Sequence, residues 1–471
     1  MSSSAFQNSY ARLPARFYSR LDPTPVAAPR LIKFNAELAQ DLGIDLDAAD
    51  PEQIAQVLSG NRRLPGSEPL AMAYAGHQFG QFVPQLGDGR AILLGELKDR
   101  AGVLRDVQLK GSGRTPYSRG GDGRAALGPV LREYIVSEAM TALGVPSTRT
   151  LAAVLSGERV LREEPMPGAI LTRIAASHVR VGTFQFFAVR GDADAVRTLA
   201  DYVIARHYPD LKDNPSAYLE LLNAVIRRQA GLVAQWLHVG FIHGVMNTDN
   251  STVSGETIDY GPCAFMDAYD ANQVFSSIDR NGRYAYSNQP AIAQWNLARL
   301  AETLLPLIDP NENRAVELAT EAVTAFVDHF EQAWLAGMRA KLGLTGANLQ
   351  DKDLAQRLLI LMQRSQADFT QTFRGLAALV ESELAPKLAQ LIADADFPAW
   401  LQEWRARLGA EGRSPSVIAA SMRAVNPKYI PRNHRIEQLI EAAVEREDFS
   451  LFEKLLAVVS RPFDEQPESD D

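Results

Sequence analysis

The stretch Arg90-Ala-Ile-Leu-Leu-Gly-Glu-Leu-Lys-Asp-Arg-Ala-Gly-Val-Leu-Arg-Asp-Val-Gln-Leu-Lys110 consists of two apolar runs separated by a turn that contains glycine. This pattern is typical of two β-strands joined as a hairpin. The next stretch, 125–143, has Leu127, Leu131 and Ile135 at helical spacing, and Gly144 is the expected helix end. A hairpin followed by one long helix predicts the core of a small β-rich lobe.

Glycines and short alternating runs extend the β-rich pattern over 66–125, and a further short β segment is expected near 165–190. Residues 1–30 are predicted to be an arm that packs on the core, because their prolines oppose helix formation. After about residue 195 the pattern is mainly helical, and the apolar positions from Val316 to Trp334 predict one buried helix face.

These patterns predict an α+β fold with two lobes. The expected parts are an N-terminal arm with a helical extension (1–65), a β-rich nucleotide-binding lobe (66–190), and a mainly helical lobe with the catalytic and metal-binding loop at 243–261 (191–471).

The composition of the 471 residues, 46% hydrophobic and 22% charged, is that of a globular protein. A net charge of -9 gives little general attraction to nucleic acid or to an anionic membrane. The single cysteine, Cys263, cannot form an intrachain disulfide or a thiolate zinc site, which fits a reducing compartment. Since we find no signal segment and no long apolar stretch, we expect a cytoplasmic protein that binds neither nucleic acid nor membrane.

Two motifs border the predicted hairpin. The run Gly87-Asp-Gly-Arg90 allows the backbone to approach a ligand closely, because glycine has no side chain. Lys110 ends an apolar strand beside a glycine turn, which is how a kinase places the lysine that contacts nucleotide phosphates. Glu133 is the expected partner of Lys110, and a Lys–Glu pair on a solvated surface is the alternative.

The loop Arg114-Thr-Pro-Tyr-Ser-Arg-Gly-Gly-Asp-Gly-Arg124 is rich in arginine and glycine. Such a loop suits polyphosphate better than burial in a core. Arg173 and Arg180 follow later in the chain, but isolated arginines are usually surface residues.

The most specific motif is His243-Gly-Val-Met-Asn-Thr-Asp-Asn-Ser-Thr-Val-Ser-Gly-Glu-Thr-Ile-Asp-Tyr-Gly261. It resembles a kinase catalytic loop followed by a short hairpin, turning at 254–255, and an Asp-aromatic-Gly element. The oxygen ligands of Asn250 and Asp259 suit Mg²⁺, and Asp249 is then free to act on a hydroxyl. An ordinary kinase places its metal-binding Asn about five residues after the catalytic Asp, whereas here the two are adjacent, which weakens the case for a plain phosphotransferase.

The strings at 74–90, 110–125, 243–250 and 426–430 resemble the signatures of the selenoprotein O family, over nearly the whole chain. The resemblance implies an atypical kinase-like fold that binds ATP in a reversed orientation. It also implies transfer of AMP from ATP to Ser, Thr or Tyr hydroxyls of proteins. Bacterial members are associated with UMP transfer too, so UTP is a second candidate co-substrate.

The resemblance also implies roles for individual positions. Asp249 would be the proton acceptor, and Glu133 would orient Lys110. Asn250 and Asp259 would hold Mg²⁺, with Mn²⁺ as the alternative. The implied nucleotide contacts are Gly87, Gly89, Arg90, Lys110, Asp122, Gly123, Arg173, Arg180 and Asp259.

Two other functions stay open. A kinase-type transfer of the γ-phosphate would use the same residues, and a nucleotide-binding pseudokinase scaffold would need no transfer. Many relatives carry a cysteine or selenocysteine near the carboxyl terminus, but the stretch 460–471 has none, so control by a terminal thiol is not expected. Cys263 is expected to be a small packed residue, and His77 and Asn247 have no assigned chemistry.

Overall fold

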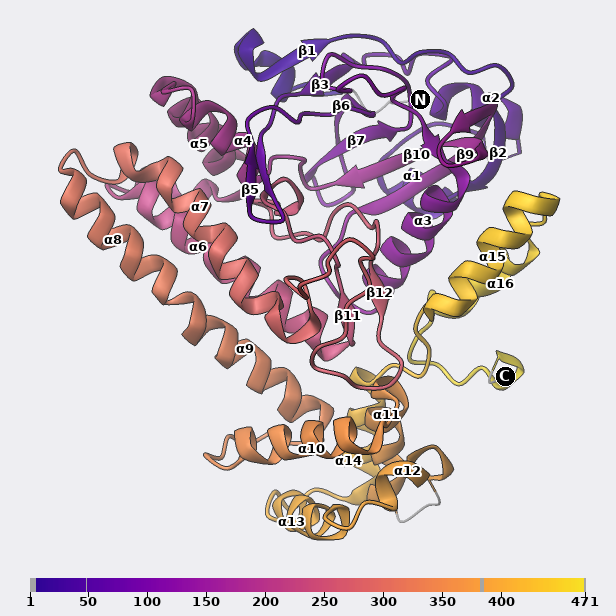
Figure 1. Ribbon diagram of the computed structural model, residues 1–471, viewed down its shortest axis with the longest axis vertical. Helices are drawn as coiled ribbons and strands as arrows, with labels where there is room; N and C mark the ends of the chain where they lie inside the picture. The colour runs from indigo at the N-terminus through magenta and orange to yellow at the C-terminus, as the bar shows by residue number, and fades with distance from the viewer. Residues whose placement is uncertain (1–5, 48, 382–384, 470–471) are drawn as a thin grey trace.

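The computed structural model describes residues 6–47, 49–381 and 385–469. A β-rich region lies at one end of the molecule, helices extend away from it, and the last long helices return to its side (Figure 1). The predicted α+β class is therefore confirmed. Residues 1–5 of the predicted arm and residues 470–471 of the predicted helical lobe lie outside the described residues.

One antiparallel sheet organises the β-rich region. Its main strands follow the spatial order β1 (Tyr18–Arg20), β3 (Leu70–Met72), β6 (Ala91–Lys98), β7 (Leu104–Lys110), β10 (Pro165–Ala175), β9 (Arg149–Leu161) and β2 (Arg30–Phe34), and β8 (Ala125–Ala126) pairs with β10. The predicted hairpin is confirmed as β6–β7, in which Ala91 lies opposite Lys110.

The N-terminal arm packs on this sheet, as predicted. Phe17 is fully buried, and Tyr18 in β1 lies opposite Met72 in β3. A second, smaller ribbon stands apart from the main sheet and is formed by β4 (Gly76–Gln78) and β5 (Gln81–Val83). A third pair, β11 (Phe241–Ile242) with β12 (Ala264–Phe265), frames the segment that contains the catalytic-loop motif.

The helices fall into two groups. Near the sheet lie α1 (Ala36–Asp41), α2 (Pro51–Leu58) and α3 (Leu127–Ala142). The later ones are α4 (Val181–Ala188), α5 (Ala193–His207), α6 (Ala217–His238), α7 (Gln289–Ile308), α8 (Glu312–Thr324), α9 (Phe326–Lys341), α10 (Asp351–Ser365), α11 (Phe369–Val380), α12 (Ala389–Ile392), α13 (Phe397–Gly409), α14 (Pro415–Val425), α15 (Asn433–Arg446) and α16 (Ser450–Val459). The predicted helix is α3, and Gly144 follows its end with a φ of 79°. None of the described helices is long and apolar enough to cross a membrane.

Three local predictions are wrong. The stripe from Val316 to Trp334 is not one buried helix face, because the helix is interrupted at Ala325, between α8 and α9. In addition, Val316 and Val327 are 45% and 44% exposed. Ala319 of the predicted stripe is buried, and α8 also buries Ala315 and Ala322, which lie outside the stripe.

The expected β segment at 165–190 ends with β10 at Ala175, and its apolar remainder forms α4; short apolar runs do not distinguish a strand from a buried helix. The expected hairpin around 254–255 is a turn whose flanks pair elsewhere, Thr252 with Arg180 and Thr257 with Ser147. These flanks therefore join the catalytic-loop segment to the sheet region.

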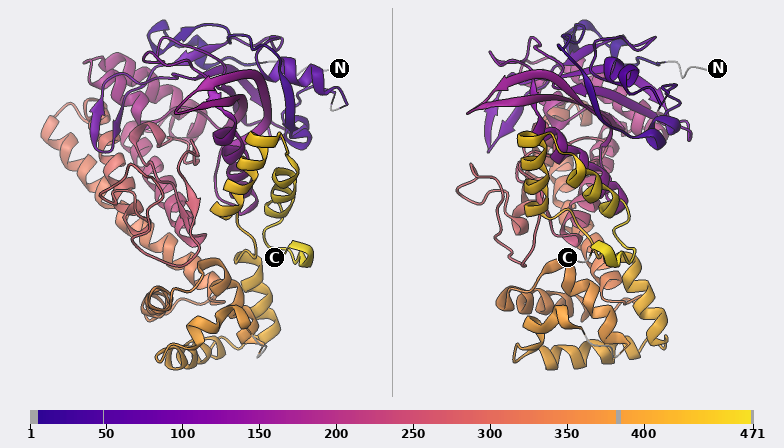
Figure 2. Two further views of the ribbon diagram at one scale, coloured as in Figure 1. Left: turned by 45° about the vertical axis from the view of Figure 1, so that its right-hand side comes forward. Right: turned by 90° about the vertical axis from the view of Figure 1, so that its right-hand side faces the viewer.

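The last two long helices brace α3. Both α15 and α16 pack against it, and this contact is visible beside the sheet (Figure 2). The rings of Tyr134 and Phe452 meet edge to face at 5.4 Å, and Arg132 pairs with Glu437. A side chain at Gly128 would lie 2.9 Å from Ile440, so α3 and α15 approach closely.

Candidate active site

A buried ion-pair cluster lies where β7, β10 and α3 meet the Asp-Tyr-Gly segment. Lys110, at the end of β7, places its Nζ 2.6 Å from Glu133 Oε2 and 2.9 Å from Asp259 Oδ1. The Lys110 and Glu133 side chains are only 14% and 3% exposed, so this is not a solvated surface pair. The structure thus brings the predicted lysine, glutamate and aspartate together.

Two arginines complete the cluster. Arg173 of β10 is 1% exposed, and its Nη2 lies 2.5 Å from Glu133 Oε1 and 2.7 Å from Asp259 Oδ1. Arg180, just before α4, places Nη1 3.0 Å from Asp259 Oδ2 and donates to the carbonyl oxygen of Asp249 at 2.7 Å. The sequence pattern alone gave these two arginines a surface position, yet both are buried.

Asp259 is held in its charged form. Burial alone would raise its pKa, but the charges of Arg173, Lys110 and Arg180 outweigh burial and hold the pKa well below its usual range. The residue has a φ of 62°, a left-handed conformation that is uncommon for a residue other than glycine. The surrounding ion pairs therefore fix a strained residue, as is often found at functional sites.

Asp249 lies in a short 3-10 turn, Thr248–Asn250, and is held very differently. Its Oδ2 accepts a hydrogen bond from Gln78 Nε2 at 3.3 Å. Its buried Oδ1 has no hydrogen-bond partner among the described residues. Burial raises the pKa of this carboxyl to about 6. A carboxylate with one unpaired oxygen and a pKa near neutrality suits a proton acceptor.

Asn250, the last residue of this turn, offers one oxygen ligand. Its Nδ2 donates to the carbonyl oxygen of Val245 at 3.0 Å, which leaves the side-chain oxygen to act as an acceptor. The described residues contain no group of three or more His, Cys, Asp or Glu side chains that could hold a metal. Mg²⁺ commonly takes only one or two carboxylates plus water and phosphate oxygens, so Asn250 and Asp259 fit such an ion.

The predicted glycine pair packs against its own chain. A side chain at Gly87, whose φ is 74°, would lie 2.3 Å from the Tyr117 ring, and one at Gly89 would lie 2.8 Å from the Tyr117 carbonyl oxygen. The 87–90 turn and the 114–124 loop are therefore in contact, and Arg90 is exposed beside them. Asp88 between the glycines is buried, and burial raises its pKa to about 6.

Asp122 and Gly123 are at the far end of this loop. Asp122 is 42% exposed and pairs with Arg162 at 2.8 Å. Gly123 has a φ of 68° and packs on the Gly113 carbonyl. Within the described chain, no hydrogen bond or ion pair joins either residue to the Lys110–Asp259 cluster.

The β4–β5 hairpin lies on the catalytic turn. His77 N donates to Thr248 Oγ1 at 2.7 Å, and Thr248 in turn donates to Gln185 at 2.6 Å. Asn247 Oδ1 accepts from Phe79 N at 3.1 Å and from the Tyr284 hydroxyl at 2.7 Å. His77 and Asn247 thus hold the hairpin and the turn together.

Sequence reasoning missed this function of His77 and Asn247, and it missed Gln78, Thr248 and Gln185 altogether. Position within the family strings at 74–90 and 243–250 was the one signal that could have directed attention to most of them.

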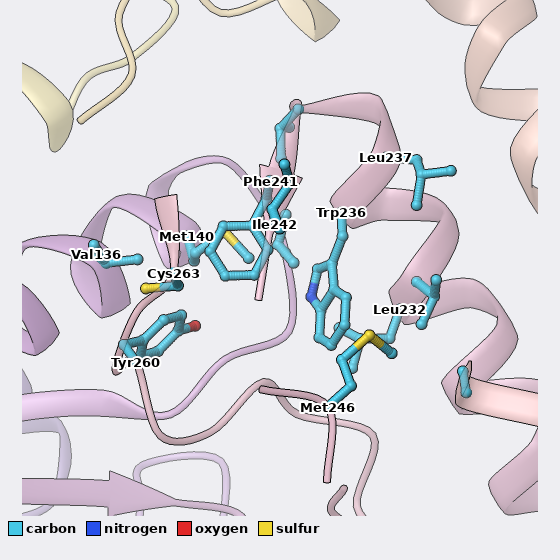
Figure 3. Close-up of a cluster of buried hydrophobic side chains, with 14 of the residues drawn as sticks. Val136, Met140, Leu232, Trp236, Leu237, Phe241, Ile242, Met246, Tyr260 and Cys263 are labelled. Atoms are coloured by element: carbon cyan, nitrogen blue, oxygen red, sulfur yellow. The ribbon is translucent and has the colours of Figure 1, made fainter. Parts of the chain in front are cut away.

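An apolar cluster packs against the segment that contains the catalytic-loop motif. Phe241, Trp236, Tyr260 and Cys263 lie within it (Figure 3). Trp236 Nε1 also donates to Thr257 Oγ1 at 2.8 Å. Burial raises the pKa of Cys263 to about 12, so this residue is a packed thiol, as predicted.

A cavity of about 720 Å³ lies elsewhere, between α11, α15, α16 and the 428–435 segment, and none of its lining residues belongs to the ion-pair cluster.

Comparison with known proteins identifies the family of the chain. Residues 1–460 match the model of a family described as protein adenylyltransferase SelO. A Rhizobium rhizogenes protein named protein nucleotidyltransferase YdiU is 64% identical over 465 residues, covering 98% of this chain and 92% of that protein. Proteins of the same name are 63% identical over 469 residues in Rhizobium meliloti (99% and 96% coverage) and 60% identical over 467 residues in Rhodopseudomonas palustris (99% and 95%).

Proposed function

Because the chain belongs to the SelO family of protein adenylyltransferases, we propose that the Lys110–Asp259 cluster holds the triphosphate of ATP and that Asp249 activates the acceptor hydroxyl. The protein is a protein nucleotidyltransferase that AMPylates proteins. One observation carries the site assignment: Lys110, Arg173 and Arg180 converge on Asp259 beside a carboxylate with an unpaired oxygen.

The proposed architecture is an atypical protein-kinase-like fold. Its parts are an N-terminal arm and helical extension (1–65), a nucleotide-binding lobe (66–190) and a mainly helical lobe (191–471). The strand-end lysine bonded to a glutamate of the next helix supports this proposal, as does the Asp-Tyr-Gly segment beside them.

The proposed contacts to the phosphates follow from the positive charges gathered in the cluster. An incoming triphosphate competes with Asp259 for the donors of Lys110, Arg173 and Arg180, which are already desolvated and oriented. The remaining proposed nucleotide contacts are Gly87, Gly89, Arg90, Asp122 and Gly123. The mutual packing of the 87–90 turn and the 114–124 loop supports placing them on one side of the nucleotide.

We assign Asn250 and Asp259 as the ligands of Mg²⁺, with Mn²⁺ as the alternative. When bound, the ion supplies positive charge to the phosphate oxygens. Asp259 suits this role because its carboxylate stays charged, and Asn250 suits it because its amide oxygen is left available.

The reaction moves AMP. The oxygen of an acceptor hydroxyl forms a bond to the α-phosphorus, and the bond from that phosphorus to the oxygen bridging to the β-phosphate breaks. The hydroxyl proton goes to Asp249, and the electron pair of the broken bond leaves with pyrophosphate. Lys110 and the two arginines offset the negative charge on the departing pyrophosphate, provided that the β- and γ-phosphates lie on the cluster side.

The acceptors are proposed to be Ser, Thr or Tyr hydroxyls of proteins, with UTP as an alternative donor that would transfer UMP. We further propose that the enzyme acts in the cytoplasm without binding nucleic acid or membrane. The overall charge of -9 favours this placement over either polyanionic surface.

The test uses the position of the label. ATP labelled at the α-phosphorus should mark the acceptor protein, which should gain the mass of one AMP unit, and γ-labelled ATP should leave it unmarked. The reverse pattern would establish a kinase-type phosphotransferase. Absence of both labels, with nucleotide binding kept, would establish a pseudokinase scaffold.

A further inference from the structure

The cavity of about 720 Å³ between α11, α15, α16 and the 428–435 segment takes no part in the proposed transfer. Its volume lies within the range of about 300–1,000 Å³ that is usual for ligand pockets. The string at 426–430, one of the four that resemble family signatures, supplies Lys428, Tyr429 and Ile430 to the cavity wall. None of these three residues belongs to the ion-pair cluster, so the string needs another explanation.

The helix α16 has two apolar faces. One face is buried and includes Phe452, whose ring packs on Tyr134 of α3. The other face is formed by Leu451, Leu455 and Val458, which line the cavity at helical spacing, and Leu451 is 42% exposed. One apolar stripe is enough to pack a surface helix on a core, so the second stripe is available to a ligand.

Positive charge lines the same cavity. Among the described lining residues, six are Lys or Arg and three are Asp or Glu, in a chain whose net charge is -9. The six cations are Arg374, Lys387, Lys428, Arg432, Arg435 and Lys454. An apolar surface with cations around it is complementary to a ligand that combines apolar groups with negative charge.

Two of these cations already bind an acidic stretch of this chain. Arg374 Nη2 and Lys428 Nζ each lie 2.6 Å from a carboxylate oxygen of Glu465, whose side chain is 62% exposed. Glu468, in the short 3-10 turn Pro467–Ser469, lines the cavity as well. The cavity wall thus pairs with carboxylates on an irregular chain segment, which is the chemistry that an acidic peptide presents.

The other cations differ in what they are free to bind. Arg432 pairs with Asp267 and Asp368, so its charge is balanced within the wall. Lys387 and Lys454 are exposed and have no ion-pair partner among the described residues. These two lysines are therefore available to the carboxylates of a bound chain.

We propose that this cavity docks an acidic segment of the acceptor protein, in which apolar side chains lie between glutamates or aspartates. The inference rests on the proposed function, in which protein hydroxyls are the acceptors. Carboxylates of the segment pair with Lys387 and Lys454, and its apolar side chains cover Leu451, Leu455 and Val458. Docking away from the reacting atoms raises the effective concentration of the acceptor hydroxyl, which gives selectivity among proteins.

Binding is measured by fluorescence anisotropy with the full-length protein and a fluorescein-labelled peptide, Glu-Glu-Leu-Leu-Glu-Glu. We expect saturable binding that is weaker in about 0.5 M salt, because exposed charges are screened. A peptide with lysines in place of the glutamates should not bind. A peptide with glycines in place of the leucines should bind about tenfold more weakly, because it buries less apolar surface.

Reversal of single charges locates the site. Lys454→Glu and Lys387→Glu should each weaken peptide binding about fivefold, because an attraction becomes a repulsion. Lys212→Glu reverses an exposed lysine that does not line the cavity, so it is the matched control and should bind the peptide as the wild type does. All three substitutions lie at exposed positions and should preserve the fold, which circular dichroism checks.

Transfer is measured in the same variants as the labelling of proteins in a cell extract from ATP labelled at the α-phosphorus. Lys454→Glu should lower the labelling, and so should an excess of the acidic peptide added to the wild type. Lys212→Glu should label as the wild type does. Labelling that neither Lys454→Glu nor the bound peptide lowers would show that the cavity does not dock acceptors.

The outcomes separate two kinds of failure. If proteins are labelled but the acidic peptide fails to bind up to about 1 mM, the docking inference is wrong and the proposed function stands. Equal peptide affinity of the wild type, Lys387→Glu and Lys454→Glu has the same meaning. If the peptide binds but the wild type labels no protein, the proposed function fails, and the assignment of the bound segment to an acceptor fails with it.

Two further results would assign the cavity to a different occupant and overturn the proposal. Equal affinity for the leucine and glycine peptides would mean that the cavity binds simple anions. A dimer in analytical ultracentrifugation that Lys454→Glu dissociates would mean that a second copy of the chain covers the cavity.

Discussion

The segments around Asp249 and Asp259 each bury an aspartate, yet they hold the two carboxyl groups in opposite states. Three cations surround Asp259 and keep its pKa well below the usual range. Asp249 is bonded through one oxygen to a neutral amide, and burial raises its pKa to about 6. Because both residues are aspartates, the difference between their pKa values comes from the groups around them.

Two carboxyl groups with divergent pKa values in one site indicate divided roles. The permanently charged Asp259 suits a cation ligand, and Asp249 can accept and release a proton near neutral pH.

The largest effect is expected from exchanging each aspartate for its neutral isostere. Asp249→Asn should lower AMP transfer by about 10²–10⁴-fold and leave nucleotide affinity nearly unchanged, because the base alone is lost. Asp259→Asn should weaken metal-dependent nucleotide binding as well. Incorporation of α-labelled ATP and calorimetric titration with and without Mg²⁺ measure the two effects. Equal loss of binding in both variants would remove the distinction between them.

The second effect concerns the free energy of unfolding, to which the ion-pair cluster around Asp259 should contribute. Glu133→Gln removes a charge that faces Lys110 and the 1% exposed Arg173, which then share Asp259 alone. Breaking a buried ion pair costs up to about 3–5 kcal/mol, and the remaining pairs with Asp259 should hold the loss below that limit. Urea unfolding measures this cost. Glu331→Gln breaks the exposed pair with Lys352 and serves as control, with a shift in midpoint close to zero. Equal urea midpoints for Glu133→Gln and Glu331→Gln would mean that the buried cluster contributes nothing to stability.

A third effect is the dependence on pH. In its proposed role as proton acceptor Asp249 must first have lost its own proton, so kcat should rise about tenfold per pH unit below about 6 and then level off. Nucleotide affinity should stay nearly constant from about pH 5 to 8, since the depressed pKa keeps Asp259 charged over that range. Rate and binding profiles measured on one preparation test this. A binding profile that follows the rate profile would contradict the separation of the two carboxyl groups.

The smallest effect is expected at Cys263, the titratable group next to the Asp-Tyr-Gly segment. Cys263→Ala should change transfer by less than about twofold, because the thiol is packed and its pKa is raised to about 12. A thiol reagent should label the native protein slowly and the urea-unfolded protein rapidly. Rapid labelling of the native protein with loss of transfer would show that this group takes part in the site.

Local patterns predicted the parts of the fold that depend on short-range periodicity. The β6–β7 hairpin and α3 followed from apolar spacing and from the glycines that end each element. The break at Ala325 was not predictable in this way, because neither glycine nor proline stands between α8 and α9.

Residues of the candidate site were predictable from the sequence where they belong to a recognisable motif. Lys110, Asp249 and Asp259 were singled out because each stands in a recognisable string, and Glu133 because it lies on the helix that follows the lysine. The structure brings Lys110, Glu133 and Asp259 into one cluster. The hydrogen bond from Gln78 to Asp249 joins residues far apart in the chain, and no periodicity reports such a contact.

The packing of α15 and α16 on α3 affects the order in which the contacts of α3 form during synthesis of the chain. The helix that holds Glu133 is made early in translation, but the helices that hold it in place are made last. The strands β9 and β10 can therefore pack on α3 before α15 and α16 have been synthesised, and the contacts of α3 with these two helices are the last to form.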